Sequence, residues 1–334
     1  MLPVFVPHLG CPHHCVFCNQ SRISGEEQPA DAETVRRLLD EAGEDPTGKR
    51  QLAFYGGSFT AIPAAQQIEL LNAAREGVER GLIASIRLST RPDAIDGTVL
   101  ERLRSFGVRT VELGAQSMDE EVLRLSGRGH SAEDVRRAAR LVKAAGFELI
   151  LQMMTGLPGD TDEKSVRTAE ELIRLRPDGV RIYPTVIVRD TALYKLWRRG
   201  LYREHGVEDA VRVCAKLLPL FEEAGVPVIR LGLNPTEELS GGAAVAGAYH
   251  PALGELVRSR VLREQAAKLL EGVEPGSEAV FSVPQRLLSQ FVGQHRQNVA
   301  ALQRQFSLSE LRVEADPADS GGIRLISVEK QREK

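Results

Sequence analysis

The sequence lacks several features that would point to particular classes of protein. Its 334 residues contain only four cysteines, too few for a disulfide framework in a chain of this length, and show no secretory leader. No apolar run approaches the roughly 20 residues of a transmembrane helix. The formal net charge is −3, so the chain as a whole does not attract nucleic acid or anionic lipid. We therefore expect a cytoplasmic protein with no membrane or DNA partner, in which any contact with a polyanion comes from a local basic patch.

Three of the four cysteines lie close together near the start of the chain. Cys11, Cys15 and Cys18 follow the apolar stretch 2–7 in the run Cys-Pro-His-His-Cys-Val-Phe-Cys. A cubane [4Fe-4S] cluster normally takes four thiolates, one per iron, so three thiolates on one short loop leave one iron with an open position. An open metal position is where a substrate or cofactor can bind. The spacing therefore predicts an iron–sulfur site.

The cysteines also allow structural interpretations. With His13 or His14 the same loop could form a Cys3His zinc site, although structural zinc sites usually draw paired ligands from two separated knuckles and no second knuckle follows. The fourth cysteine, Cys214, lies in the apolar helical pattern 211–220 and is most simply a buried core thiol.

The cysteine run, with the aromatic Phe17 just before its last cysteine, resembles the signature of the radical S-adenosylmethionine (SAM) superfamily. In that family SAM binds the open iron, and an electron from the cluster splits it into methionine and a 5′-deoxyadenosyl radical that abstracts hydrogen from carbon. The protein orients the cofactor and excludes water. The resemblance implies a [4Fe-4S] cluster and SAM as cofactors, Phe17 beside them, and an electron donor such as flavodoxin or ferredoxin.

Short apolar runs alternate with helical patterns over residues 1–232. Strands are expected at 2–6, 51–55, 85–88, 110–113, 148–152, 179–182 and 227–230, and helices at 32–41, 64–80, 99–106, 132–145, 163–175 and 207–223, with Asp162 as a cap. Such alternation predicts an α/β fold with a parallel sheet and helices outside it. Six βα repeats and a last strand resemble the partial (βα)6 TIM-like barrel of the radical SAM type.

Two glycines follow the second expected strand. Gly56 and Gly57, with Ser58 after them, lie where functional groups of βα barrels collect, at the carboxyl end of a strand. Alone they would indicate a tight turn, because glycine lets backbone approach other groups closely. After a cysteine loop in the preceding unit, they resemble the superfamily's Gly-Gly motif. The resemblance implies that Gly56, Gly57 and Ser58 contact SAM, with the glycines holding its amino group.

The fourth expected strand ends in the run 112–117, and Arg128-Gly129-His130 follows Gln116 by twelve residues. Gln116 offers an amide, and Arg128 offers a planar fork suited to a carboxylate. This stretch resembles both the catalytic subunit of Elongator and the oxygen-independent coproporphyrinogen oxidases, in which the matching residues contact SAM. The runs 143–147, 153–154, 181–185 and 191–197 favour the Elongator-like family.

The chain departs from both families. No counterpart of Elongator's acetyltransferase domain follows, because only about a hundred residues remain and they carry no acyl-CoA loop, so acetyl-CoA is not an expected co-substrate. Gln152 stands where the coproporphyrinogen oxidase pattern has Asp before its Gly-Leu-Pro-Gly, which weakens the porphyrin interpretation. The amide of Gln152 is a further predicted contact to SAM.

Two more strand-end residues are candidates for handling substrate. Tyr183 follows the sixth expected strand and could donate a hydrogen atom or a proton, although such tyrosines are more often packing residues with one wet edge. Arg230 closes the seventh strand. The arginines at 136, 137 and 140 indicate a solvated helix face.

The last hundred residues have a different pattern. A loop-rich and helical connection over 233–274 contains a long helix at 251–270. A small α/β module over 275–330 follows, with a strand at 278–283, helices at 285–291 and 298–306 around a turn at 292–296, and strands at 311–314 and 323–328. This order resembles a KH module, whose Gly-x-x-Gly turn clamps a nucleic-acid backbone. The second glycine is replaced here, and a locally basic set predicts RNA contacts: Arg286, His295, Arg296 and Arg304.

The leading hypothesis is a radical SAM enzyme that modifies RNA at a transfer RNA base, with Tyr183 in the chemistry. A second hypothesis keeps the enzyme but changes the substrate to a tetrapyrrole or another small metabolite. A third is a non-catalytic cluster or haem carrier. In all three, residues 1–232 form the partial barrel.

Overall fold

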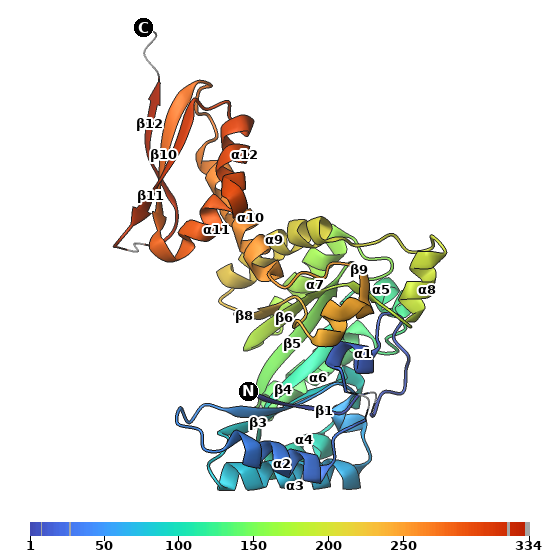
Figure 1. The fold of residues 1–334 in the computed structure, drawn as a ribbon. Coiled ribbons are helices and arrows are strands. Elements are labelled where there is room, and N and C mark those ends of the chain that lie inside the picture. The colour runs from blue at the N-terminus through green and yellow to red at the C-terminus, as the bar shows by residue number, and fades with distance from the viewer. Residues whose placement is uncertain (8, 27, 319–320, 331–334) are drawn as a thin grey trace. The chain divides into compact units, whose positions relative to one another are not determined.

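The computed structural model describes residues 1–7, 9–26, 28–318 and 321–330 (Figure 1). Internal contacts divide the chain into two units: Met1–Val213 with Leu220–Pro251, and Cys214–Pro219 with Ala252–Lys334. The domain boundaries predicted at residues 232 and 274 remain predictions.

A seven-stranded parallel sheet forms the first unit. Its order is β1-β2-β3-β4-β5-β6-β8, and every neighbouring pair is parallel. The strands are β1 (Leu2–Phe5), β2 (Gln51–Tyr55), β3 (Ser85–Thr90), β4 (Val108–Gln116), β5 (Glu148–Thr155), β6 (Gly179–Pro184) and β8 (Val228–Leu231). Because β1 and β8 are the two edges and do not pair with each other, the sheet is a partial barrel, and the predicted fold class is confirmed.

Helices connect the strands, and Figure 1 shows α2, α3 and α4 together next to the first strands. They are α1 (Gln20–Ser24), α2 (Ala32–Ala42), α3 (Ala64–Glu79), α4 (Gly97–Ser105), α5 (Glu120–Leu125), α6 (Ala132–Ala144), α7 (Asp162–Arg174), α8 (Ala192–Arg198) and α9 (Val207–Glu223). The six longer helices predicted from sequence are all present within two residues. The short α1, α5 and α8 were not predicted, nor was the small antiparallel sheet of β7 (Val186–Val188) and β9 (Ala244–Gly247).

Several of these helices begin at a side chain that accepts a hydrogen bond from the first turn. Asp31, Asp96 and Ser131 cap α2, α4 and α6, and Thr161 caps α7 by accepting from the N–H of Lys164. Such caps satisfy backbone donors that have no partner inside the helix. The prediction that Asp162 is the cap was wrong by one residue: Asp162 is the first helical residue, where its charge still suits the positive helix end.

The second unit is a small sheet with helices beside it. The strand order is β11-β10-β12, with β10 (Ser277–Pro284) parallel to β11 (Glu310–Asp316) and antiparallel to β12 (Arg324–Lys330). Its helices are α10 (Leu253–Leu269), α11 (Leu288–Val292) and α12 (Gln297–Gln305). The helix predicted over 285–291 is a 3₁₀ turn, η4 (Gln285–Leu287), that runs into α11. Phe281 and Phe291 pack in the core with ring centroids 5.3 Å apart.

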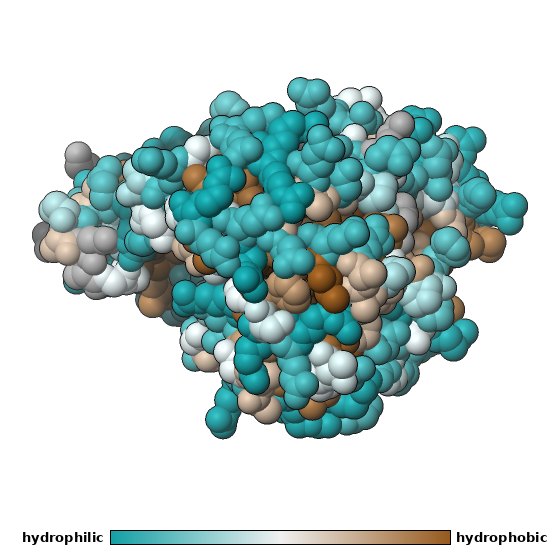
Figure 2. All heavy atoms as spheres, turned by 90° about the horizontal axis from the view of Figure 1, so that it is seen from below, coloured by the Kyte–Doolittle hydropathy of each residue, from teal (hydrophilic) through white to brown (hydrophobic). Residues whose placement is uncertain are grey.

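The surface shown in Figure 2 is mostly hydrophilic, with hydrophobic side chains in small separate groups. Single exposed apolar residues are normal for a folded protein. Among the residues that the structure describes, no helix is long and apolar enough to cross a bilayer.

Candidate active site

A cavity of about 780 Å³ lies within the partial barrel. Residues from the cysteine loop, from the ends of the first four strands and from the inner face of the sheet line it. They include Cys11, Cys15, Phe17, Cys18, Gly56, Gly57, Gln116, Arg128, Gln152, Arg181, Tyr183 and Arg230. The fold therefore brings most of the predicted barrel-site residues to one space.

The three cysteines are half-buried around one end of this cavity. Burial raises the pKa of the Cys11 thiol, and burial together with Cys15 and Cys11 raises the pKa of Cys18 to about 12. Arg128 donates from Nη1 to Cys15 Sγ at 3.3 Å. Within the described ranges, no three His, Cys, Asp or Glu side chains converge on a point that could hold a single ion. A cubane places each ligand on a separate iron, so thiols spread around a cavity fit it.

The cysteine loop and the glycine loop interlock through their backbones. Gly10 has a φ of +69°, and a Cβ there would lie 2.3 Å from the carbonyl oxygen of Ser58. A Cβ on Gly57 would lie 2.3 Å from the carbonyl oxygen of Leu9. The N–H of Ser58 donates to that same oxygen at 2.7 Å. Both positions therefore require glycine, and the role of Gly10 was missed because it depends on a contact 48 residues away.

Gln20, at the start of α1, ties the same two loops together. Its Oε1 accepts from the N–H of Gly57 at 2.8 Å, and its side chain acts against the effect of burial by lowering the pKa of the Cys11 and Cys18 thiols. Nothing in the sequence singled out this glutamine.

Gln116 and Arg128 lie at the carboxyl end of β4, and each has a buried polar atom without a partner among the residues that the structure describes. Gln116 is 8% exposed, adopts the left-handed backbone region at φ 65°, and has a buried Oε1 without a hydrogen bond among the described residues. Strained residues of this kind collect at functional sites. Arg128 donates to the carbonyl oxygen of Gly114 at 2.7 Å, while its Nε is buried and unpaired in the same set. A Cβ on Gly114 would meet the Gln116 amide nitrogen at 2.8 Å, so Gly114 makes room for both side chains.

Behind Arg128 lies a buried group that fixes its backbone. Arg91, 4% exposed, donates to the carbonyl oxygen of Arg128 at 2.6 Å and forms two hydrogen bonds with Asp93. Its own N–H donates to Ser58 Oγ, which is also 3.1 Å from Thr90 Oγ1. Ser58 is fully buried and is not among the lining residues, so its hydroxyl is used inside the protein rather than turned toward the cavity.

His130 gives this region a dependence on pH. Burial, with the nearby charge of Arg128, lowers the pKa of His130 to about 4. The unfolded chain, with a pKa near 6.5, therefore binds more protons between pH 4 and 6.5, and stability falls as pH drops through that range. We expect the wild type to lose about 1.3 kcal/mol between pH 7.5 and 5.5 from this group. Urea unfolding at both pH values should show a smaller loss for His130→Gln; an unchanged loss would contradict this assignment.

Farther along the inner face of the sheet, four polar side chains meet at one carboxylate. Glu112 on β4 is fully buried, and its Oε1 lies 2.9 Å from Arg87 Nη1, 3.0 Å from Arg181 Nη2 and 3.0 Å from Tyr55 Oη. Its Oε2 lies 2.8 Å from Gln152 Nε2 and 2.9 Å from Arg181 Nε. Burial lowers the pKa of Arg181, but Glu112 and the tyrosines outweigh burial and raise it overall. We name these five residues the polar layer: Tyr55, Arg87, Glu112, Gln152 and Arg181.

Removing the charge of Glu112 should destabilise the barrel strongly. In Glu112→Gln two guanidinium groups keep their positions without a carboxylate, and breaking a buried pair this way costs about 3–5 kcal/mol. Glu148→Gln is the matched control, because Glu148 pairs with the exposed Arg109 and such pairs contribute about 0–1 kcal/mol. Urea unfolding would measure both; equal losses would contradict the account of the polar layer.

Tyr183 on β6 lines the cavity next to this layer. Arg181 Nη1 donates to its hydroxyl at 3.4 Å, and burial raises the pKa of the phenol. Tyr183 is therefore a protonated phenol, able to give up a proton or a hydrogen atom.

The four residues predicted to bind RNA belong to the second unit and are not among the residues that line this cavity. Arg286, His295, Arg296 and Arg304 are all exposed there. His295 and Arg296 are neighbours in the turn before α12, both with positive φ, whereas Arg304 lies eight residues farther, about 12 Å along the helix.

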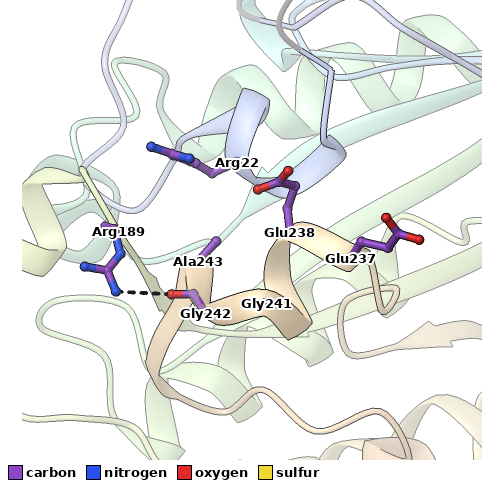
Figure 3. Close-up of a pocket in the computed structure, with 7 residues that line it drawn as sticks. All are labelled: Arg22, Arg189, Glu237, Glu238, Gly241, Gly242 and Ala243. Atoms are coloured by element: carbon purple, nitrogen blue, oxygen red, sulfur yellow. Dashed lines mark hydrogen bonds between the residues drawn. The ribbon is translucent and has the colours of Figure 1, made fainter.

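A second, smaller hollow of about 310 Å³ lies at the surface of the first unit (Figure 3). In Figure 3 the guanidinium of Arg22 points away from Glu237 and Glu238, and Arg189 donates to the carbonyl oxygen of Gly242 at 3.5 Å. Arg22 pairs at 3.2 Å with Asp190, but both side chains are about half exposed. Water screens such exposed pairs, so this pair contributes little to stability. We assign no function to this hollow.

The sequence of this chain is similar to those of curated proteins. A tRNA uridine(34) acetyltransferase of Methanocaldococcus infernus is 31% identical over 249 residues, 61% of this chain and 46% of that protein. Human Elongator complex protein 3 is 32% identical over 192 residues, 52% of this chain and 35% of that protein. The chain thus spans about half or less of the length of these curated relatives.

Solved structures show the same fold. An N-terminally truncated Elp3 from M. infernus superposes with a TM-score of 0.60 at 24% identity, covering 82% of this chain and 66% of that chain. Coproporphyrinogen III oxidase from Escherichia coli superposes with a TM-score of 0.50 at 19% identity, covering 67% and 52%.

Two family models match in chain order. The Radical SAM C-terminal domain model covers residues 177–263, and the Radical SAM superfamily model covers residues 5–172, which is half of the chain and includes the cysteine loop, the glycine pair, Gln116 and Arg128. The chain belongs to the radical SAM superfamily.

Proposed function

We propose that this radical SAM enzyme modifies RNA and that its target is a base of transfer RNA. The observation that carries the proposal is the cavity that joins three cysteines to Gly56, Gly57, Gln116 and Arg128 in a chain related to enzymes named for action on tRNA uridine 34. An RNA substrate would place the enzyme in the cytoplasm, as the composition predicts.

The enzymes of this superfamily use a [4Fe-4S] cluster and SAM, which together supply a radical able to take hydrogen from carbon. In this chain Cys11, Cys15 and Cys18 would hold the cluster. Arg128, 3.3 Å from Cys15 Sγ, places a fixed positive charge beside these thiolates. A flavodoxin or ferredoxin would provide the electron.

SAM would be held at the same end of the cavity by groups with unused hydrogen-bonding atoms. The carbonyl oxygens of Gly56 and Gly57 would accept from its amino group. The N–H of Gly57 would not contact SAM, because it already donates to Gln20. The buried Oε1 of Gln116 would accept another donor, and Arg128 suits its carboxylate. Phe17 supplies an apolar wall.

Ser58 and Gln152 have side-chain polar atoms that are already hydrogen-bonded within the protein, so fewer of their atoms can contact SAM. The hydroxyl of Ser58 is hydrogen-bonded inside the protein, so Ser58 would act through its backbone and through Arg91. Gln152 Nε2 is committed to Glu112, which leaves its Oε1 for a ligand. Tyr183, farther along the cavity, would be the residue that gives or takes a proton or hydrogen atom at the substrate.

The RNA backbone would be bound by the exposed turn of the second unit. Asn298, two residues after the turn, is buried and donates from Nδ2 to Ser259 Oγ at 2.8 Å and to the carbonyl oxygen of Phe291 at 3.0 Å. These bonds fix the turn while His295 and Arg296 remain exposed. Arg286 and Arg304 would extend the contact along a phosphate chain.

Replacing Arg296 by alanine should weaken RNA binding in a salt-dependent way. Loss of one phosphate contact lowers the slope of log affinity against log salt by about 1. Arg312→Ala is the control, since Arg312 is an exposed arginine of the same unit that pairs with Glu278. Binding of total transfer RNA at several salt concentrations would measure the slopes; equal slopes for both variants would remove the turn from the RNA interface.

The function is tested in cells. A deletion strain should lack one modified nucleoside in its digested transfer RNA, and the wild-type gene, but not Cys15→Ala, should restore it. If the purified enzyme cleaves SAM while the nucleoside profile of the deletion strain is unchanged, RNA is not the substrate.

A tetrapyrrole or another small metabolite is the second candidate, because the spacing from Gln116 to His130 also resembles the oxygen-independent coproporphyrinogen oxidases. Stoichiometric porphyrin binding without RNA affinity would favour it. A cluster or haem carrier would bind SAM without releasing 5′-deoxyadenosine after reduction, which distinguishes it from both enzymes.

A further inference from the structure

The charges that line the cavity are all of one sign. Five arginines line it, and none of the lining residues in the described part of the chain is Asp or Glu. Arg91 and Arg128 lie at the cysteine end, where Asp93 and Cys15 are their partners. The other three arginines, at positions 87, 181 and 230, lie on β3, β6 and β8.

Glu112 neutralises only part of this second group. A carboxylate has about four acceptor positions, and the polar layer fills them with two guanidinium groups, a hydroxyl and an amide. Two positive charges against one negative leave an excess in a buried place, and an uncompensated buried charge is costly. Arg87 Nε is buried and unpaired among the described residues.

Arg230 adds a further positive charge beside this excess. It pairs with Arg181 in the register of β6 and β8, so the two side chains start from neighbouring positions. In the described structure its hydrogen bond is one from Nε to the carbonyl oxygen of Gly232 at 2.9 Å. Among the described residues, its two terminal nitrogens form no ion pair with a carboxylate, and Tyr183 also lines the cavity.

This end of the cavity is separate from the cysteine end. Glu112 precedes Gln116 by four residues on β4, which corresponds to roughly 13 Å of extended chain. Arg128 can therefore serve a carboxylate near the cysteines while Arg181 and Arg230 serve a different group. Apolar residues of the two edge strands, Phe5 and Ile229, line the same cavity and suit a flat ring.

We propose that Arg181, Arg230 and Tyr183 form an oxyanion site that holds a phosphate or carboxylate of the substrate away from the cysteine end. The arginines supply charge-assisted donors and the tyrosine a neutral one. A nucleotide phosphate is the expected source, and that choice rests on the proposed function. A carboxylic acid is the other source of the same chemistry.

The test uses the reconstituted full chain with saturating SAM and no reductant, so that the SAM carboxylate occupies its own site. Calorimetric titration at constant ionic strength would compare uridine 5′-monophosphate, uridine and succinate. We expect the monophosphate to bind at least tenfold more tightly than uridine, and Arg230→Gln to abolish this preference. Arg181→Lys should reduce it while keeping the charge that faces Glu112. Arg109→Gln, an exposed arginine of β4, should leave it unchanged.

The possible outcomes separate the sources. Arg230-dependent binding of succinate without a preference for the monophosphate would keep the oxyanion site and assign it to a carboxylic acid. Equal binding of all three probes, or an unchanged preference in Arg230→Gln, would overturn the proposal. Neither result depends on the nucleoside profile of a deletion strain, so the site and the RNA function can fail independently.

Discussion

Cys15→Ala should lose SAM cleavage to the background of the assay, a fall of at least about a thousandfold, or about 4 kcal/mol of transition-state stabilisation. With one thiolate gone, the loop can hold the cubane at only two irons, and Arg128 loses its contact at 3.3 Å with Cys15 Sγ. Release of 5′-deoxyadenosine after reduction measures the activity, and iron and sulfide analysis measures the cluster. Cys11→Ala and Cys18→Ala should behave in the same way.

The control for this experiment is the remaining cysteine. Cys214 is fully buried in α9, and Cys214→Ala should keep the cluster and SAM cleavage while costing about 1 kcal/mol of stability. If Cys15→Ala kept a full complement of iron and normal cleavage, the loop would not be the cluster site.

Gly10→Ala should disable the enzyme without touching any cofactor ligand. The added Cβ would lie 2.3 Å from the carbonyl oxygen of Ser58 and 2.8 Å from the backbone nitrogen of Ile62, and backbone atoms cannot rotate away. Relieving this clash means separating the cysteine loop from the glycine loop, at a cost of roughly 3 kcal/mol. We expect cluster content to fall and SAM affinity to drop at least tenfold, measured by equilibrium dialysis.

A second glycine separates the clash from the backbone cost. Gly81 has nearly the same conformation, φ +71°, but nothing lies within 4 Å of a Cβ placed there. Gly81→Ala should therefore lose only the free energy of the left-handed conformation, about 1 kcal/mol of stability, and should keep its cluster and SAM affinity. Equal behaviour of the two variants would show that the interlock of the two loops does not matter.

The regular elements of this protein could be predicted from sequence because their signals are local. Alternating apolar runs and helical periodicity located the seven strands and six long helices, and the cysteine spacing indicated the end of the first strand as a site. The short α1, α5 and α8 and the strands β7 and β9 were missed, since segments of three to seven residues carry too little periodicity.

The support around the site could not be predicted, because it depends on which side chains the sheet register brings together. Glu112 and Arg181 are 69 residues apart in sequence, and Gly57 reaches Gln20 across 37 residues. The order of motifs can suggest that loops meet. It cannot show that Ser58 is turned inward to Thr90, or that Gly10 is needed for the two loops to touch.

The cysteine run indicated the radical SAM superfamily, and the family model over residues 5–172 confirms it. The resemblance of the second unit to a KH module remains a prediction. Its order of strand, helices, turn and strands is present, with the third strand antiparallel to the central β10.

The most direct test of the account is a Mössbauer spectrum of the anaerobically reconstituted ⁵⁷Fe protein, recorded with and without SAM. We predict a cubane in which one iron site changes its parameters when SAM is added, while the other three keep theirs. A spectrum without a cubane, or a cubane whose four irons are all indifferent to SAM, would contradict the assignment of Cys11, Cys15 and Cys18 as its only protein ligands.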